Sequence, residues 1–289
     1  MPLVNLSGAC DLHVHSGPSL FVRSGSDRYM AQLAQEAGLA AILLKSHFES
    51  TVGRAALADE MVEGVRVFGG LVLNQFAGGL NLAAVENALE LGAKQIWMPT
   101  IDAQAHLKTF APAGGKTYQE SGTKVPRQGI TILDDQGRLK EEAKLIVEMV
   151  REKGAILGTA HLGREEVFSL ARFAKEVGFS KLLVTHPYFD PPRLSVPEQK
   201  ELVDLGCTLE FCGGNLYPIP GVARLENYLE SIAAVGPESV ILTSDAGQPR
   251  KSAPAEVLRV FAQCLMEKKI SQEDLDLMTK KNPARLLGF

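Results

Sequence analysis

The sequence has few cysteines, a single tryptophan and no long apolar run. None of its four cysteines forms a Cys-x-x-Cys pair, which argues against a disulfide framework or a zinc–thiolate cluster and indicates small buried side chains in a reducing compartment. No apolar run reaches the roughly 18 residues that a membrane helix needs. No charged stretch followed by an apolar one opens the sequence, so we expect no signal peptide and a cytoplasmic protein.

The sequence also lacks a strong excess of charge of either sign. The net charge is −4, with 45% hydrophobic and 22% charged residues, which is typical of a soluble globular protein. This balance offers no basic surface for nucleic acid or for an anionic membrane. We therefore expect a small molecule as the partner, and association with further copies of the chain stays open.

A regular alternation of two hydrophobic patterns runs along almost the whole chain. Apolar runs rich in β-branched residues predict eight strands. The first ends at residue 15, and the others span residues 39–44, 65–73, 95–98, 155–160, 181–185, 207–212 and 240–244. Helical periodicity predicts helices at 27–38, 51–63, 81–92, 139–153, 165–178, 197–206, 225–235, 254–268 and 272–280. Eight such units favour a (β/α)8 TIM barrel with extra C-terminal helices, formed by residues 1–289 as a single domain. A doubly wound open sheet is the alternative, although no Gly-x-Gly-x-x-Gly follows an early strand.

The alternation breaks between residues 99 and 137, after the fourth predicted strand. A short hairpin is predicted at 130–137, and loops of this length in a compact domain are usually functional, so we interpret the segment as an ordered lid. Lys116, Tyr118, Lys124 and Arg127 within it could bind an acidic substrate. Solvated loop charge is the alternative for most of them.

Polar side chains gather where the predicted strands end, which is where barrels of this kind place their active sites. The first strand ends in Asp11-Leu12-His13-Val14-His15, and strand periodicity puts its two histidines on one face, about 6–7 Å apart. Of the six histidines, five end a predicted strand, and the sixth, His106, lies just past the fourth. Imidazoles clustered in this way predict a metal site, and none of them falls in a predicted helix.

The strand-end residues resemble those of the amidohydrolase superfamily of metal-dependent hydrolases. Its barrels carry His-x-His on strand 1, a histidine on strands 5 and 6, and an aspartate on strand 8, and the matching residues here are His13, His15, His161, His186 and Asp245. The ending Asn-Pro-Ala-Arg-Leu-Leu-Gly at 282–288 is also similar, and the chain looks most like the uncharacterised amidohydrolase-related branch. The resemblance implies these five residues as ligands for zinc or another divalent metal such as Mn, Fe, Ni or Co.

One feature departs from the superfamily. Its binuclear members bridge two metals with a carboxylated lysine or a glutamate on strand 4, and residues 95–100 contain neither. One ion is therefore favoured and two remain open. Lys45, His47 and Glu210 are the candidates for a second ion or for substrate binding.

The expected reaction is hydrolysis of an amide, a lactone or another ester by metal-activated water, with Asp245 as general base. His186 would either bind the metal or hydrogen-bond the attacking water, and the alternative for Asp245 is a helix N-cap. A metal-dependent decarboxylase or lyase on the same barrel is a second interpretation. A phosphoesterase of the polymerase-and-histidinol-phosphatase type is a third, and a non-catalytic metal-binding barrel is a fourth.

Overall fold

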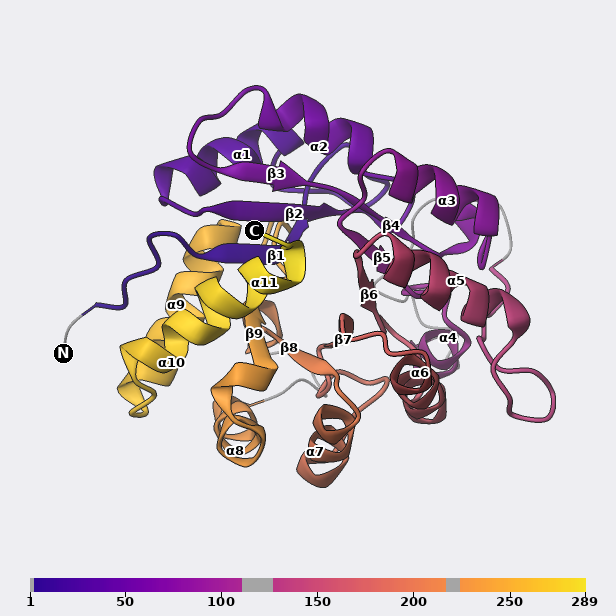
Figure 1. Ribbon diagram of the computed structural model, residues 1–289. Helices are drawn as coiled ribbons and strands as arrows, with labels where there is room; N and C mark the ends of the chain where they lie inside the picture. Colours follow the sequence, from indigo (N-terminus) through magenta and orange to yellow (C-terminus); the bar gives the residue numbers. More distant parts are fainter. Residues whose placement is uncertain (1–2, 111–126, 217–223) are drawn as a thin grey trace.

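The computed structural model describes residues 3–110, 127–216 and 224–289. Figure 1 shows strands gathered around a centre with helices outside them. The strands follow in chain order: β1 (Cys10–His15), β2 (Ala41–Lys45), β3 (Arg66–Phe68), β4 (Gly70–Val72), β5 (Gln95–Trp97), β6 (Ile156–Gly158), β7 (Leu182–Thr185), β8 (Thr208–Cys212) and β9 (Val240–Thr243).

Every neighbouring pair of these strands runs parallel, as the alternation of strands and helices predicts. One sheet has the order β1-β2-β3 and the other runs from β4 to β9. The strands β3 and β4 are two halves of one predicted strand, divided at Gly69, where a Cβ atom would lie 2.5 Å from the carbonyl oxygen of Thr51. The ring closes where Val14 bridges Ala246 in parallel and the backbone N–H of His15 donates to the Ala246 carbonyl at 2.8 Å.

Helices follow the strands and cover the outside of the ring. They are α1 (Asp27–Glu36), α2 (Val52–Asp59), α3 (Leu82–Glu90), α4 (Gln104–Phe110), α5 (Glu141–Glu152), α6 (Arg164–Glu176), α7 (Val196–Asp204), α8 (Leu225–Val235), α9 (Pro254–Glu267), α10 (Gln272–Asp276) and α11 (Asn282–Leu287), with 3-10 turns η1 (Gln75–Ala77), η2 (Gly213–Leu216) and η3 (Pro237–Ser239) and a π turn η4 (Leu277–Lys281). The predicted (β/α)8 barrel with additional C-terminal helices is confirmed.

Local chemistry sets where several helices begin. Ser26 caps α1, since its side chain accepts from the backbone N–H of Tyr29. Asn81 caps α3 by accepting from the backbone N–H of Ala84. Hydrophobic faces of these helices bury against strands that are buried over most of their length, which is the usual condition of a parallel sheet.

The segment after β5 contains a helix that the sequence pattern did not predict. Residues 104–110 form α4, and the backbone N–H of Gln104 donates to the Ile130 carbonyl at 2.8 Å. The statement that no histidine lies in a helix is therefore wrong for His106. The turn at 134–137 forms as predicted, with an antiparallel bridge between Leu133 and Leu139. Most of the predicted lid, at 111–126, lies outside the described residues.

Glu166 ties this segment to α6. Its carboxylate accepts from the N–H of Gly163 at 2.8 Å, from the N–H of Ile132 at 3.0 Å and from the hydroxyl of Thr131 at 2.6 Å. Glu166, in the first turn of α6, thus stabilises both the helix start and the attachment of a distant chain segment. No helix within the described residues has the length and apolar character to cross a membrane.

Candidate metal centre

His13 and His15 lie on β1 with almost fully buried side chains, and both face Asp245 at the end of β9. The Oδ1 atom of Asp245 is 3.3 Å from Nε2 of His13 and 3.2 Å from Nε2 of His15. One ligand atom from each residue lies within 4.8 Å of the other two. Ligands at about 2.1 Å from a shared tetrahedral ion are about 3.4 Å apart, so this donor set fits a divalent metal.

Behind His13, a buried carboxylate fixes the ring. Oε1 of Glu210, on β8, lies 2.8 Å from Nδ1 of His13 and accepts from the hydroxyl of Thr243 at 3.0 Å. Because a carboxylate at this position accepts from Nδ1–H, the lone pair of His13 is left on Nε2, the nitrogen that faces Asp245. Carboxylates that orient metal-ligating histidines in this way are common in metal sites. Within the described residues, Oε2 of Glu210 has no hydrogen-bond partner.

His15 has its own orienting contact. Its Nδ1 lies 3.2 Å from the carbonyl oxygen of Lys45, which can only accept, so the contact holds a proton on Nδ1 and leaves Nε2 free for an ion. The guanidinium of Arg23 lies 3.3 Å from the same nitrogen and can donate only to the other tautomer. We favour the first tautomer because it also places the lone pair toward Asp245, as in His13.

Lys45 enters the same space from β2. Its ammonium lies 3.0 Å from Nε2 of His13 and 5.3 Å from the ring centre of Trp97, and the side chain is 1% exposed. Burial lowers the pKa of Lys45, against the opposing attraction of Asp245 and Glu210. A cationic donor therefore lies beside the nitrogen that a metal ion would use.

The remaining histidines line the same hollow. Nδ1 of His47 lies 2.9 Å from the hydroxyl of Thr100, and its ring centre is 5.0 Å from that of His15. Nδ1 of His161 lies 2.8 Å from Nδ1 of His106, so one of the two rings donates to the other. The helix α4 thus supplies a partner for a predicted site residue, and His106 is a functional candidate that only its proximity to the fourth strand suggested.

His186 ends β7 and lies within the same cluster. Its ring centre is 5.0 Å from that of His161 and 6.3 Å from that of His13. Among the described residues, its Nδ1 atom is buried without a hydrogen-bond partner. The structure brings His161 and His186 beside the group formed by His13, His15 and Asp245, but not into it.

The backbone is strained where these side chains enter the hollow. Ala160, His186 and Asp245 have φ values of 52°, 32° and 46°, a region that residues other than glycine seldom adopt. Gly247 has φ 124°, and a Cβ atom there would lie 1.8 Å from the carbonyl oxygen of His15. Such strain clusters at functional sites, where the surrounding structure has to hold it. No helix begins at Asp245, so it is not a helix N-cap.

Burial and neighbouring charges set the protonation states. Burial alone raises the pKa of Asp245, but the neighbouring imidazoles of His13 and His15 and the ammonium of Lys251 outweigh it and hold that pKa well below its usual range. Burial lowers the pKa of His186 to about 4 and holds those of His15, His47 and His161 well below the ordinary value. The site therefore combines an ionised carboxylate with imidazoles at His15, His47, His161 and His186 that are neutral near pH 7, which is the protonation that metal ligation requires.

Asp11 serves as a structural tie between β1 and β9. Its Oδ1 accepts from the backbone N–H groups of His13, at 3.2 Å, and Ser244, at 3.0 Å. Burial raises the pKa of Asp11 to about 6. The carboxylate of Asp11 thus fixes the His13-Val14-His15 segment of β1 relative to the end of β9, next to Asp245.

The hollow over these residues has a volume of about 130 Å³. All six histidines line it. The other lining residues are Lys45, Ile101, Phe110, Phe189, Asn215, Asp245, Gln248 and Lys251. Of the predicted substrate loop, Lys116, Tyr118 and Lys124 lie outside the described residues. Arg127 is described, and its Nε lies 3.6 Å from the buried carboxylate of Asp102, but it is not among the residues that line the hollow.

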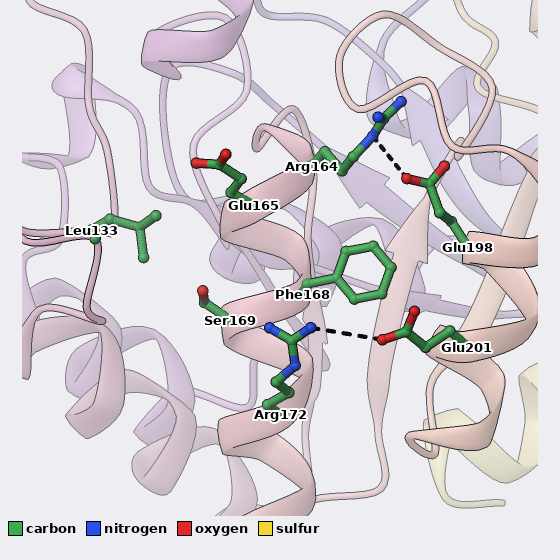
Figure 2. Close-up of a pocket in the computed structure, with 9 residues that line it drawn as sticks. Leu133, Arg164, Glu165, Phe168, Ser169, Arg172, Glu198 and Glu201 are labelled. Carbon is green, nitrogen blue, oxygen red and sulfur yellow. Dashed lines mark ion pairs between the residues drawn. The ribbon is translucent and has the colours of Figure 1, made fainter.

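A second hollow, of about 400 Å³, lies between α6 and α7 (Figure 2). Arg164 faces Glu198 at 3.1 Å, and Arg172 faces Glu201 at 3.6 Å, so the charges from the two helices pair with each other across the groove. Phe168 lies between the two pairs in Figure 2. This groove brings together neither histidines nor unpartnered buried groups within the described part of the chain.

A model of one protein family matches more than half of the chain. Residues 8–210 match the model described as "Family of unknown function (DUF6282)", and since this is more than half of the chain, the protein belongs to that family. No protein of curated function matches the sequence.

Solved structures share the fold over nearly the full length. An amidohydrolase from Pseudomonas aeruginosa is similar with a TM-score of 0.62 and 13% identity, covering 97% of this chain and 95% of the other. A dipeptidase described as a metallo peptidase has a TM-score of 0.61 and 12% identity, covering 97% and 98%. A variant of an organophosphorus hydrolase from Deinococcus radiodurans has a TM-score of 0.57 and 14% identity, covering 99% and 95%. The barrel is therefore the one that the sequence resemblance implied.

Proposed function

We propose that this protein is a metal-dependent hydrolase of a small molecule that carries an amide, a lactone or another ester. The observation that carries the proposal is the convergence of Nε2 of His13, Nε2 of His15 and Oδ1 of Asp245 at the carboxyl ends of β1 and β9. The names of the similar structures, an amidohydrolase, a metallo peptidase and an organophosphorus hydrolase, support the same class of reaction.

Two imidazoles and one carboxylate suit zinc, and also Mn, Fe, Ni or Co. When bound, the ion supplies Lewis acidity, which polarises a carbonyl group and lowers the pKa of water toward 7. A second group of possible ligand atoms, from His13, Glu210 and Cys212, shares His13 with the first group. One ion is favoured, because a single imidazole cannot complete both groups at once. Glu210 and Lys45 both contact His13, so we assign them to orienting that ring and to binding substrate rather than to a second ion.

The residues around the ion have separate roles in the proposed reaction. Asp245, ionised at neutral pH, holds the attacking water by accepting its hydrogen bond and receives its proton as general base. His186 has a buried ring nitrogen without a partner in the described part of the chain, and this nitrogen can hydrogen-bond the same water or the leaving group. Lys45 and His47 face the position of the scissile carbonyl as donors for the charge that develops on its oxygen.

The experiment is a turnover assay on protein stripped with a chelator and then reloaded with Zn²⁺, Mn²⁺, Fe²⁺, Co²⁺ or Ni²⁺. The substrate panel contains lactones, N-acyl compounds, phosphomonoesters and β-keto acids. We expect hydrolysis of an ester or amide that falls more than tenfold on stripping and returns on reloading. Turnover that survives stripping contradicts metal dependence, and turnover confined to β-keto acids identifies a decarboxylase instead.

A further inference from the structure

One side of the central hollow is polar and takes no part in the roles assigned above. It is formed by Asn215 in η2 and by Gln248 and Lys251, which follow β9. Asn215 is 6% exposed, and the phenol of Tyr228 is a hydrogen-bonding neighbour of its side chain. Among the described residues, no acceptor meets the geometry of a hydrogen bond with its Nδ2 atom. Oε1 of Gln248 has no hydrogen-bond partner among them either. Buried polar atoms without partners are uncommon in folded proteins, so a bound polar group is the natural partner here.

The ammonium group of Lys251 is held at the same side. It donates to the backbone carbonyl of Asp245 at 3.2 Å, and its charge helps to keep the pKa of the Asp245 carboxyl low, although no carboxylate within the described ranges lies within ion-pair distance of it. A Cβ atom on Gly214 would lie 2.6 Å from this Nζ atom and 2.7 Å from the Asp245 carbonyl, so the seat of the ammonium depends on glycine at 214. Within the described residues, the ammonium uses one of its three hydrogens in this hydrogen bond, which leaves it able to bind an anion.

Aromatic and aliphatic side chains line the hollow as well. The ring centres of Phe110 and Phe189 are 5.6 Å apart, and that of Phe189 is 4.8 Å from the ring of His186. Ile101 adds a buried aliphatic surface. A volume of about 130 Å³ corresponds to about four water molecules, so the enclosed part of a ligand is small.

We propose that Asn215 and Lys251 form a carboxylate-binding subsite, so that the ligand of this hollow is a small carboxylic acid with an apolar substituent that packs on Phe110 and Phe189. As a statement about substrate, the inference rests on the proposed hydrolase function, whereas the binding itself does not. A single ammonium and a single amide N–H group match the single charge and two oxygens of a carboxylate. Gln248 accepts from an N–H or O–H group of the same ligand.

The test is calorimetric titration of the full-length protein, metal-stripped and zinc-loaded, with benzoate, the neutral isostere benzamide and phenylphosphonate. We expect Lys251→Gln to weaken benzoate binding about tenfold to a hundredfold and to leave benzamide unchanged, because a charge-assisted hydrogen bond is lost. Lys251→Arg restores part of the affinity. The matched control is Lys268→Gln, which removes an exposed lysine after α9 and leaves benzoate binding unchanged. Asn215→Asp, which keeps the side-chain shape, also weakens benzoate binding and provides a second variant.

Equal benzoate affinity in wild type and Lys251→Gln overturns the subsite. Benzoate binding that occurs only in zinc-loaded protein also overturns it, because the carboxylate is then held by the ion. Tighter binding of phenylphosphonate than of benzoate replaces the carboxylate with a phosphonate-like group and contradicts the assigned class. Failure of the protein to bind any metal, with benzoate binding still dependent on Lys251, contradicts the hydrolase proposal and leaves the subsite standing.

Discussion

The hollow at the strand ends is smaller than the groove between α6 and α7, yet the hollow is the one that contains the candidate site. The groove measures about 400 Å³ and the hollow about 130 Å³. In the groove, Arg172 and Glu201 are 62% and 56% exposed and pair with each other, whereas His13, which lines the hollow, and Glu210 behind it are 1% and 0% exposed. Charges that water and a partner already satisfy need no ligand, and buried polar atoms without partners do. Burial combined with unmet bonding capacity therefore marks the site better than volume does.

The largest effect is expected at Asp245. Asp245→Asn keeps the shape of the side chain but removes the negative charge, so turnover of whichever panel ester or amide the wild type hydrolyses falls about 100-fold to 10,000-fold. The measurement is kcat/KM for both proteins at saturating metal. Glu201→Gln, in the groove, is the matched control and leaves kcat/KM unchanged. Undiminished turnover in Asp245→Asn removes this residue as the base.

Metal binding should stabilise the fold measurably. An ion at 100 times its Kd adds about 2.7 kcal/mol to the free energy of unfolding, which raises Tm by about 4–5 °C for a chain of this size. Thermal unfolding of stripped and reloaded protein measures the shift. An unchanged Tm at saturating metal would show that the hollow binds no ion in the folded state.

Glu210 should affect ion affinity through His13. Glu210→Gln replaces the carboxylate that orients the His13 ring, so ion affinity falls about tenfold to a hundredfold. Competition with a coloured chelator measures the Kd, and Glu165→Gln in the groove serves as the control for loss of one carboxylate. Equal affinity for wild type and Glu210→Gln is incompatible with the orienting role.

The smallest effect is expected in the groove. A double-mutant cycle on Arg172→Ala and Glu201→Ala should give a coupling of about 0–1 kcal/mol in the free energy of unfolding, because both side chains are largely exposed. Denaturant titration measures the coupling, and kcat/KM stays at the wild-type value. A loss of turnover in either single variant would show that the groove, and not only the hollow at the strand ends, contributes to catalysis.

The strand-end positions of His13, His15 and Asp245 could be predicted because strand periodicity is local and a barrel brings the ends of all its strands to one face. The eight-fold alternation predicted the barrel for the same reason. Cap residues such as Asn81 were also readable from their neighbours.

Contacts between distant segments could not be predicted in this way. The helix α4 begins where Gln104 bonds to Ile130, a contact that leaves no periodic signal at 104–110. Its His106 therefore gained no assigned role, although its ring meets His161. Likewise, the spacing of Lys45 and His47 suggested a second ion, but only the assembled barrel places Lys45 against His13 and His47 against Thr100.

The central claim is that the side chains of His13, His15 and Asp245 bind a catalytic metal ion. Elemental analysis of protein purified after metal-supplemented expression tests it most directly, with the paired variants His13→Gln and His15→Gln, and with Lys268→Gln as the surface control. We expect about one equivalent of a transition metal in wild type and control, and a large loss in both histidine variants. Less than about half an equivalent of any transition metal in the wild type, or equal content in all four proteins, would contradict the claim.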